Sequence, residues 1–97
     1  MSKRHRFLVC YDIADAKRLR RVARVCESYG RRIQFSVFES TLSNTMMASL
    51  RAELDIIINH DTDQILFVDL GADDASTPFT MEYIGMPYVK KNRITII

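Results

Sequence analysis

Glycine and proline are scarce in this chain of 97 residues, which contains three Gly and two Pro. Their scarcity excludes long flexible linkers, which are rich in such residues. The apolar share of 47% and the charged share of 27% are typical of an ordinary globular domain. We therefore expect one domain over residues 1–97. A chain of this length buries only a modest share of its surface, so dimerisation would help to stabilise it.

Long apolar runs are also absent, since none approaches the roughly 18 residues of a membrane-spanning helix. A signal peptide is not expected, because Cys10-Tyr11-Asp12 interrupts the short apolar stretch near the start. We therefore expect a cytoplasmic protein that does not contact membranes. The two cysteines, Cys10 and Cys26, form no CxxC motif, and we expect both to be reduced core residues. The sequence shows no glycine-rich phosphate loop and no zinc pattern.

Charge is distributed unevenly along the chain. Residues 1–34 contain ten Lys or Arg and three Asp or Glu, a net charge of +7, whereas residues 35–97 contain four and nine, a net charge of −5. Such a basic third indicates a surface for a polyanion, although solvated arginines on a helix face would look the same. The residues we expect to bind nucleic acid are Lys17, Arg18, Arg20, Arg21, Arg24 and Arg31.

Periodicity predicts the order of helices and strands. Strands are expected at 7–11 and 64–70, helices at 16–29 and about 45–59, and an alternating segment at 32–42 that is long enough for two short strands with a tight bend. Residues 72–88 contain both prolines and are expected to be irregular, and a short strand is expected at 93–97. This order predicts an α+β fold, a ferredoxin-like βαββαβ plait with an extra short C-terminal strand.

Local signals support the two helices. Asp15 is expected to cap the first helix and Gly30 to end it, and Ser43 or Asn44 can cap the second. With both helices on one face of the sheet, the other face would be bare. Alternation places Gln34, Ser36 and Phe38 on a separate face from Ile33, Phe35 and Val37. A partly apolar bare face favours burial against a second copy of the chain.

Asp12 is the candidate metal ligand, because an apolar strand leads directly to it and a loop follows. Carboxylate oxygens suit Mg²⁺, which needs only one or two carboxylates and keeps several waters. One carboxylate makes a poor site, but two copies of Asp12 across a twofold axis would make a workable one. The alternative is that Asp12 caps the turn into the helix.

Three other residues are candidates for a role beside Asp12. Arg32 could contact a phosphate or be a plain surface residue. Ser36 could donate a hydrogen bond near the metal; it has no partner histidine, so it is not expected to be a nucleophile. Phe38 could stack on a base, or lie in the core or at an interface.

The chain resembles the CRISPR-associated protein 2 family, the small partner in CRISPR spacer acquisition. The resemblance is dense to about residue 58 and loose beyond Gly71. It rests on residues 11–15, 17–23, 29–30 and 32–39, with Leu42, Leu50 and Leu54 at leucine positions of the second helix. The tyrosine–aspartate strand end followed by Arg32-Ile33-Gln34-Phe35-Ser36-Val37-Phe38-Glu39 is specific in combination.

The resemblance implies a ferredoxin-like homodimer with a divalent metal, such as Mg²⁺, between the two copies of Asp12. It implies a partnership with the CRISPR-associated protein 1 integrase and metal-dependent endonuclease activity on single-stranded RNA or double-stranded DNA. By the family pattern Asp12 is the metal-binding aspartate, and the residues near it are Tyr11, Arg32, Ser36 and Phe38.

Three functions remain open from the sequence. The first is a Mg²⁺-dependent phosphodiesterase, which needs Asp12. The second is a non-catalytic dimeric scaffold that holds DNA for the integrase, which needs the arginines and not Asp12. The third is a toxin-like ribonuclease, which a neighbouring antitoxin gene would support.

Overall fold

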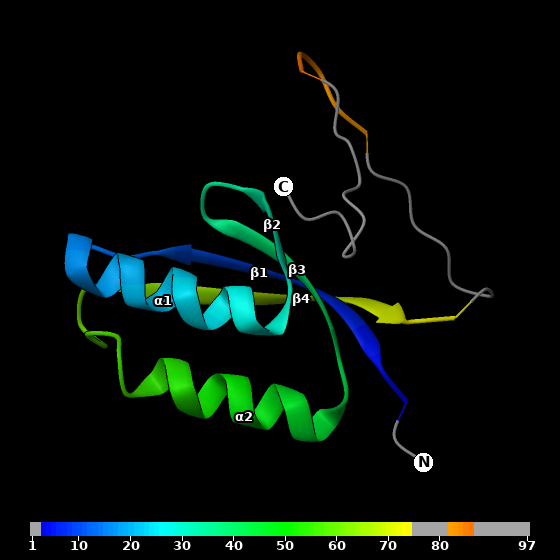
Figure 1. Cartoon of the computed structure of the whole chain (residues 1–97), viewed down its shortest axis with the longest axis horizontal. Coiled ribbons are helices and arrows are strands. Elements are labelled where there is room, and N and C mark those ends of the chain that lie inside the picture. Colours follow the sequence, from blue (N-terminus) through cyan, green and yellow to red (C-terminus); the bar gives the residue numbers. More distant parts are fainter. Residues whose placement is uncertain (1–2, 75–81, 87–97) are drawn as a thin grey trace.

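The computed structural model describes residues 3–74 and 82–86, and Figure 1 shows how its elements are arranged. The predicted strand at 93–97 lies outside the described residues, and the prediction of one domain over 1–97 stays a prediction. The elements are β1 (His5–Asp12), α1 (Ala16–Tyr29), β2 (Arg31–Gln34), β3 (Val37–Leu42), α2 (Asn44–Asp55) and β4 (Gln64–Ala72). No helix in the described part of the chain is long and apolar enough to cross a membrane.

The four strands form one antiparallel sheet in the order β2-β3-β1-β4. β1 is therefore central, between β3 and β4, and β4 forms one edge. Both helices pack on the same face, where residues of α1 and α2 share a core with residues of β1 and β3 (Figure 1). The βαββαβ order and this arrangement confirm the predicted α+β, ferredoxin-like fold.

The ends of α1 are set by the two residues predicted to set them. The Asp15 carboxylate accepts a hydrogen bond from the backbone N–H of Arg18 at 2.9 Å, and this bond lowers the pKa of Asp15. Gly30 has an extended backbone, with φ of −167°, so its special feature is a close approach to β3. A Cβ atom there would lie 2.2 Å from the backbone oxygen of Glu39. A glycine is needed at this position because the sheet passes directly beside it.

The alternating segment forms a hairpin whose turn is at Phe35 and Ser36, which supplies the bend that the sequence could not locate. The turn and a register shift between Arg32 and Gln34 change which side chains face the helices. Phe38 is 0% exposed and lies in the core, whereas Phe35 is 72% exposed. The prediction that Phe38 shares a bare face with Gln34 is therefore wrong.

The other element boundaries differ from prediction by a few residues. Ser43 caps α2 by accepting from the N–H of Met46 at 3.2 Å, but the helix ends at Asp55 and not at residue 59. After Asp55 the chain continues in a turn, in which the Leu54 carbonyl accepts from the N–H groups of Ile57 and Ile58. β1 and β4 are each longer than predicted. Residues 73–74 and 82–86 contain no helix or strand, as expected.

The sheet face without helices carries apolar side chains from β1 and β4. Leu66 and Val68 are 50% and 43% exposed, and they pair in register with Cys10 and Leu8. We call these four residues the open-face patch. Alternation places all of them on the side opposite the core residue Val9. A partly apolar bare face was predicted, and its most exposed apolar side chains come from β4, with Val37 of β3 beside Cys10 of β1.

Candidate metal and nucleic-acid site

Asp12 is the last residue of β1 and its side chain is exposed. Alternation along β1 places it on the same face as Leu8 and Cys10, and its partner across the strand pair is Gln64 of β4. Among the described residues Asp12 forms no side-chain hydrogen bond or ion pair, so its carboxylate does not cap the turn into α1. The carboxylate is free to accept a ligand at the end of the open-face patch.

The backbone beside Asp12 is held by the neighbouring tyrosine. Tyr11 is 6% exposed, and its N–H donates to the carbonyl of Ser36 at 3.1 Å. Its hydroxyl donates to the carbonyl of Phe35 at 3.2 Å, and its ring stacks on Phe38 at 6.1 Å between centroids. These contacts fasten the hairpin turn beside the end of β1. Tyr11 therefore places Ser36 of the turn close to Asp12.

Arg32 extends over the aromatic side of this hairpin. Its guanidinium carbon lies 5.1 Å from the centroid of Phe38 and 5.8 Å from that of Phe35. Phe38 is fully buried beneath it, so the role of a base-stacking platform is wrong for Phe38. Phe35 has the exposed ring. Arg32 is exposed and retains a charge that a phosphate could contact.

An acidic residue that the sequence did not single out lies behind Asp12. The Asp63 side chain is 0% exposed and precedes β4 directly. Its Oδ1 accepts from the N–H of Ala14 at 2.9 Å, and its Oδ2 accepts from Nε of Arg18 at 2.8 Å and from the N–H of Asn59 at 2.9 Å. The bond from Arg18 is the main reason that the pKa of Asp63 lies well below its usual range. Neither periodicity nor a motif marks Asp63 in the sequence.

Arg18 is therefore not one of a uniform set of basic residues. Its guanidinium binds Asp63 through Nε and through Nη2, the latter at 3.3 Å, and these bonds raise the pKa of Arg18. Its charge is already paired with Asp63, and the prediction that Arg18 contacts nucleic acid stays a prediction. Arg31 is also matched, because its guanidinium forms an ion pair with Glu39.

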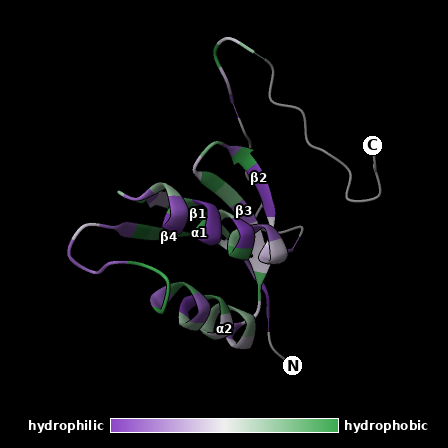
Figure 2. Ribbon diagram, turned by 60° about the vertical axis from the view of Figure 1, so that its left-hand side comes forward, coloured by the Kyte–Doolittle hydropathy of each residue, from purple (hydrophilic) through white to green (hydrophobic). Residues whose placement is uncertain are grey.

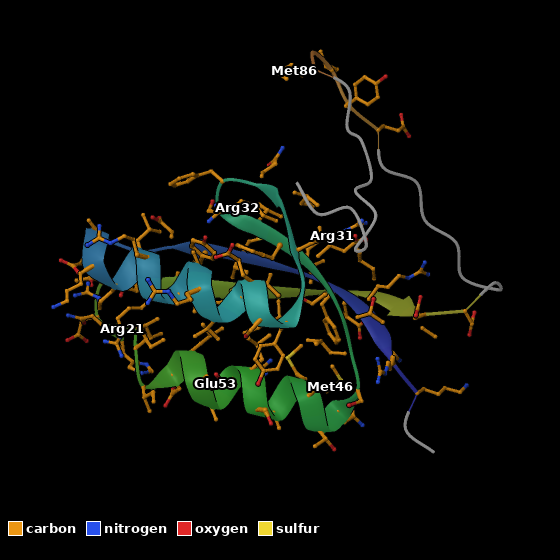
Figure 3. All side chains as sticks on the ribbon, viewed as in Figure 1. Arg21, Arg31, Arg32, Met46, Glu53 and Met86 are labelled. Atoms are coloured by element: carbon orange, nitrogen blue, oxygen red, sulfur yellow. The ribbon has the colours of Figure 1, made fainter. Side chains whose placement is uncertain are left out.

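The remaining basic residues of the first helix lie on the exposed side of α1, and Figure 2 colours much of this helix as hydrophilic. We call these four residues the α1 basic face: Lys17, Arg20, Arg21 and Arg24. None of the four forms an ion pair with another described residue. Figure 3 shows Arg21 on α1, whereas Arg31 and Arg32 belong to β2 of the hairpin.

The structure does not gather all the predicted residues into one site. α1 covers the sheet face that Asp12 does not share, so the α1 basic face and the Asp12 carboxylate lie on different sides of a protomer. Ser36 lies beside the end of β1 through its bond to Tyr11, whereas Arg32 is the register partner of the core residue Phe38 and lies on the helix-covered face. The two groups need not act on the same part of a ligand.

The cysteines differ from one another. Both are free, and Cys26 is buried in the core, where burial raises the pKa of its thiol to about 11. Cys10 is half-buried on the open face, so the prediction that it is a core residue is wrong.

Within residues 3–74 and 82–86 no group of three or more His, Cys, Asp or Glu could hold a metal ion.

Comparison with known proteins identifies relatives of the whole plait. The family model for CRISPR associated protein Cas2 matches residues 5–77. CRISPR-associated endoribonuclease Cas2 1 of Rhodospirillum rubrum is 34% identical over 94 residues, which is 96% of this chain and 90% of the relative. CRISPR-associated endoribonuclease Cas2 4 of the same organism is 48% identical over 61 residues, 63% of this chain, and the match spans only 49% of that relative.

Solved structures that are similar to this chain also include Cas2 proteins. The crystal structure of Streptococcus pyogenes Cas2 at pH 6.5 is similar with a TM-score of 0.66 and 35% identity, and the match covers 79% of this chain and 99% of that one. A chain of a partial Cas6-RT-Cas1–Cas2 complex has a TM-score of 0.64 at 23% identity, over 88% of this chain and 99% of that one, and shows the fold alone.

Proposed function

Because this chain belongs to the CRISPR-associated Cas2 family, we propose that it is a homodimeric, metal-dependent endonuclease of CRISPR spacer acquisition. RNA is the first substrate to test, since several relatives are named endoribonucleases. Duplex DNA is the second, since a relative from Halalkalibacterium halodurans is named an endonuclease, a name that is not restricted to RNA. The observation that carries the proposal is the exposed carboxylate of Asp12, free of partners in the described chain and adjacent to the open-face patch.

The open-face patch supports the dimer. Leu66 and Val68 expose about half of their side chains, and covering them with the same patch of a second copy removes apolar surface from water. Asp12 lies at the end of this patch, so a twofold axis across the face would bring the two Asp12 carboxylates to one cleft. Each protomer then supplies one ligand, and the site is incomplete without the partner.

Two Asp12 carboxylates suit Mg²⁺, a hard cation that takes oxygen ligands and keeps several waters. A bound Mg²⁺ would lower the pKa of an attacking water and offset negative charge on a scissile phosphate. The chain's own residues orient the substrate. Arg32 provides a cation on the helix-covered side of β2 that can bind a phosphate oxygen at the edge of the sheet, and Tyr11 keeps the hairpin against the end of β1.

Without an intervening cation the two carboxylates repel one another, which opposes closure of the dimer. Mg²⁺ in the millimolar range is therefore expected to tighten the dimer. The Ser36 side chain is half-buried at the turn beside Asp12, where a hydroxyl can donate to a substrate oxygen.

A second function is favoured by the separation between Asp12 and the α1 basic face. A dimer carries two such basic faces, away from the cleft, and these can bind the backbone of a duplex without cutting it. The protein would then hold DNA for the CRISPR-associated protein 1 integrase. Spacer acquisition by the Asp12→Ala variant separates the two functions, because retained acquisition supports the scaffold.

The nuclease is tested with purified protein, single-stranded RNA and duplex DNA, with and without Mg²⁺. We expect Asp12→Asn to abolish cleavage while the dimer remains folded, because the variant loses the ligand and keeps the shape. Asp61→Asn, the same change at an exposed position of another loop, is the matched control and should cleave normally. Equal cleavage by wild type and Asp12→Asn would remove Asp12 from the mechanism.

A further inference from the structure

Asp63 connects three segments that meet behind Asp12. It accepts from Ala14 in the loop after β1, from Arg18 in the first turns of α1, and from Asn59 in the loop after α2. We call this set the Asp63 clamp. Asp63 is also the neighbour of Gln64, which is the register partner of Asp12. The clamp therefore holds the loop that follows Asp12 and lies next to the β4 residue that pairs with Asp12.

We propose that Asp63 is a positioning residue for Asp12: it holds the loop after β1 so that the Asp12 carboxylate stays aimed at the shared cleft. This inference rests on the proposed function of Asp12. Only Ile13 separates Asp12 from the clamped N–H of Ala14. Movement of the loop would move Asp12 directly, and a carboxylate misplaced by about 1 Å loses much of its effect in a catalytic site.

The chemistry of the clamp requires a carboxylate. Within the described part of the chain, every group that bonds to the two Asp63 oxygens is a donor: two backbone N–H groups, the Arg18 guanidinium, and the Thr62 hydroxyl at 3.1 Å. An asparagine at this position would turn an NH₂ group toward some of those donors, whichever way its amide were oriented. Asp63→Asn therefore has nearly the same shape and breaks at least two of the bonds.

A purely structural role for Asp63 predicts something different. If the clamp only stabilised the fold, its loss would lower the fraction of folded protein, and the folded remainder would have a normal Asp12. If the clamp positions Asp12, the folded variant has a weaker cation site, and more cation compensates for part of the loss. The behaviour at high metal concentration therefore distinguishes the two roles.

The experiment compares the wild type with Asp63→Asn and Arg18→Lys, with Asp61→Asn as the matched control. Arg18→Lys retains the positive charge but has one nitrogen in place of the two that bind Asp63. It provides a second test of the clamp if Asp63→Asn does not fold. Three quantities are measured on the full chain: exchange of the Ala14 amide proton by NMR, affinity for Mn²⁺ by electron paramagnetic resonance, and kcat and KM for RNA cleavage.

We expect the Ala14 amide to exchange about tenfold faster in Asp63→Asn, because its hydrogen bond is either lost or made to a neutral amide oxygen in place of a carboxylate. Mn²⁺ affinity and kcat should fall with KM nearly unchanged, since Asp63 does not touch the substrate, and saturating Mn²⁺ should restore part of kcat. Asp61→Asn should match the wild type. Unchanged Ala14 exchange in folded Asp63→Asn, or faster exchange with unchanged Mn²⁺ affinity and kcat, would overturn the clamp.

Failure of the proposed function has a separate signature. If the wild type neither binds Mn²⁺ nor cleaves RNA or duplex DNA, the nuclease proposal is wrong. The clamp is then judged from the backbone relaxation of Asp12 and Ile13. Increased fast motion of these two residues in Asp63→Asn supports the clamp, and unchanged order overturns it.

Discussion

Truncation of Leu66 tests the dimer from which the shared cleft is inferred. Leu66 is 50% exposed on the open face, so about half of its side chain remains to be covered by a partner. Full burial of a leucine side chain contributes about 1.5–3 kcal/mol, so covering the exposed half contributes about 1 kcal/mol. A twofold interface contains the residue twice, which gives about 2 kcal/mol for Leu66→Ala, or about a 30-fold weaker dimer.

Sedimentation equilibrium over a range of protein concentrations measures this change directly. Ile56→Ala is the matched control, since Ile56 is 81% exposed and directly follows α2, away from the open face. We expect its dimer constant to equal that of the wild type. Urea unfolding of both variants shows whether the protomer remains folded. A dimer constant that does not change in Leu66→Ala, or that changes equally in Ile56→Ala, would refute the open face as the interface.

The same substitution predicts a kinetic effect. If one cleft needs Asp12 from both protomers, activity per protomer in Leu66→Ala should fall as the protein is diluted through its dimer constant. Higher protein concentration should restore it, because the chemical groups of the site are unchanged. Activity independent of concentration across the monomer–dimer transition would show that one protomer is enough.

Three other predictions concern the fold and the charges. Gly30→Ala should destabilise the protein by about 1–3 kcal/mol in urea unfolding, because its new methyl group meets the backbone of Glu39, which cannot move aside easily; a stable variant would contradict the close approach. Neutralising the α1 basic face should weaken duplex binding and make log affinity fall less steeply with log salt, by up to about 0.9 in slope for each phosphate that is no longer neutralised, whereas unchanged binding would exclude this face. The substitutions to alanine are at Lys17, Arg20, Arg21 and Arg24. The lowered pKa of Asp63 makes the clamp stabilising above the ordinary carboxyl value of 3.8, so the stability difference between wild type and Asp63→Asn should shrink as pH falls below that value; a pH-independent difference in acid unfolding would contradict this sign.

The candidate site was only partly predictable. Asp12 could be found because an apolar strand leads to it and a loop follows, both of which are local signals. Asp63 could not be found, because its partner Arg18 is 45 positions away and no periodicity connects them. For the same reason the sequence does not distinguish Arg18 from the other basic residues of α1, because it does not show which arginine is paired with a carboxylate.

The sequence also did not predict which residues of the hairpin face the helices. Alternation assumes an unbroken strand, and a turn at Phe35 and Ser36 together with a register shift reverses which side chains point inward. Phe38 therefore entered the core, and the open-face patch formed from β1 and β4. One misplaced residue in the count changes the face of every residue after it.

The sequence by itself determined the order and type of the elements, the cap at Asp15 and the stop at Gly30, because these depend on neighbours a few positions away. Tertiary structure alone decided which side chains share a surface. It buried Phe38, paired Asp63 with Arg18, and separated Asp12 from the basic side of α1. Such outcomes depend on how segments that are far apart in the sequence pack together, and these contacts leave no local pattern in the sequence.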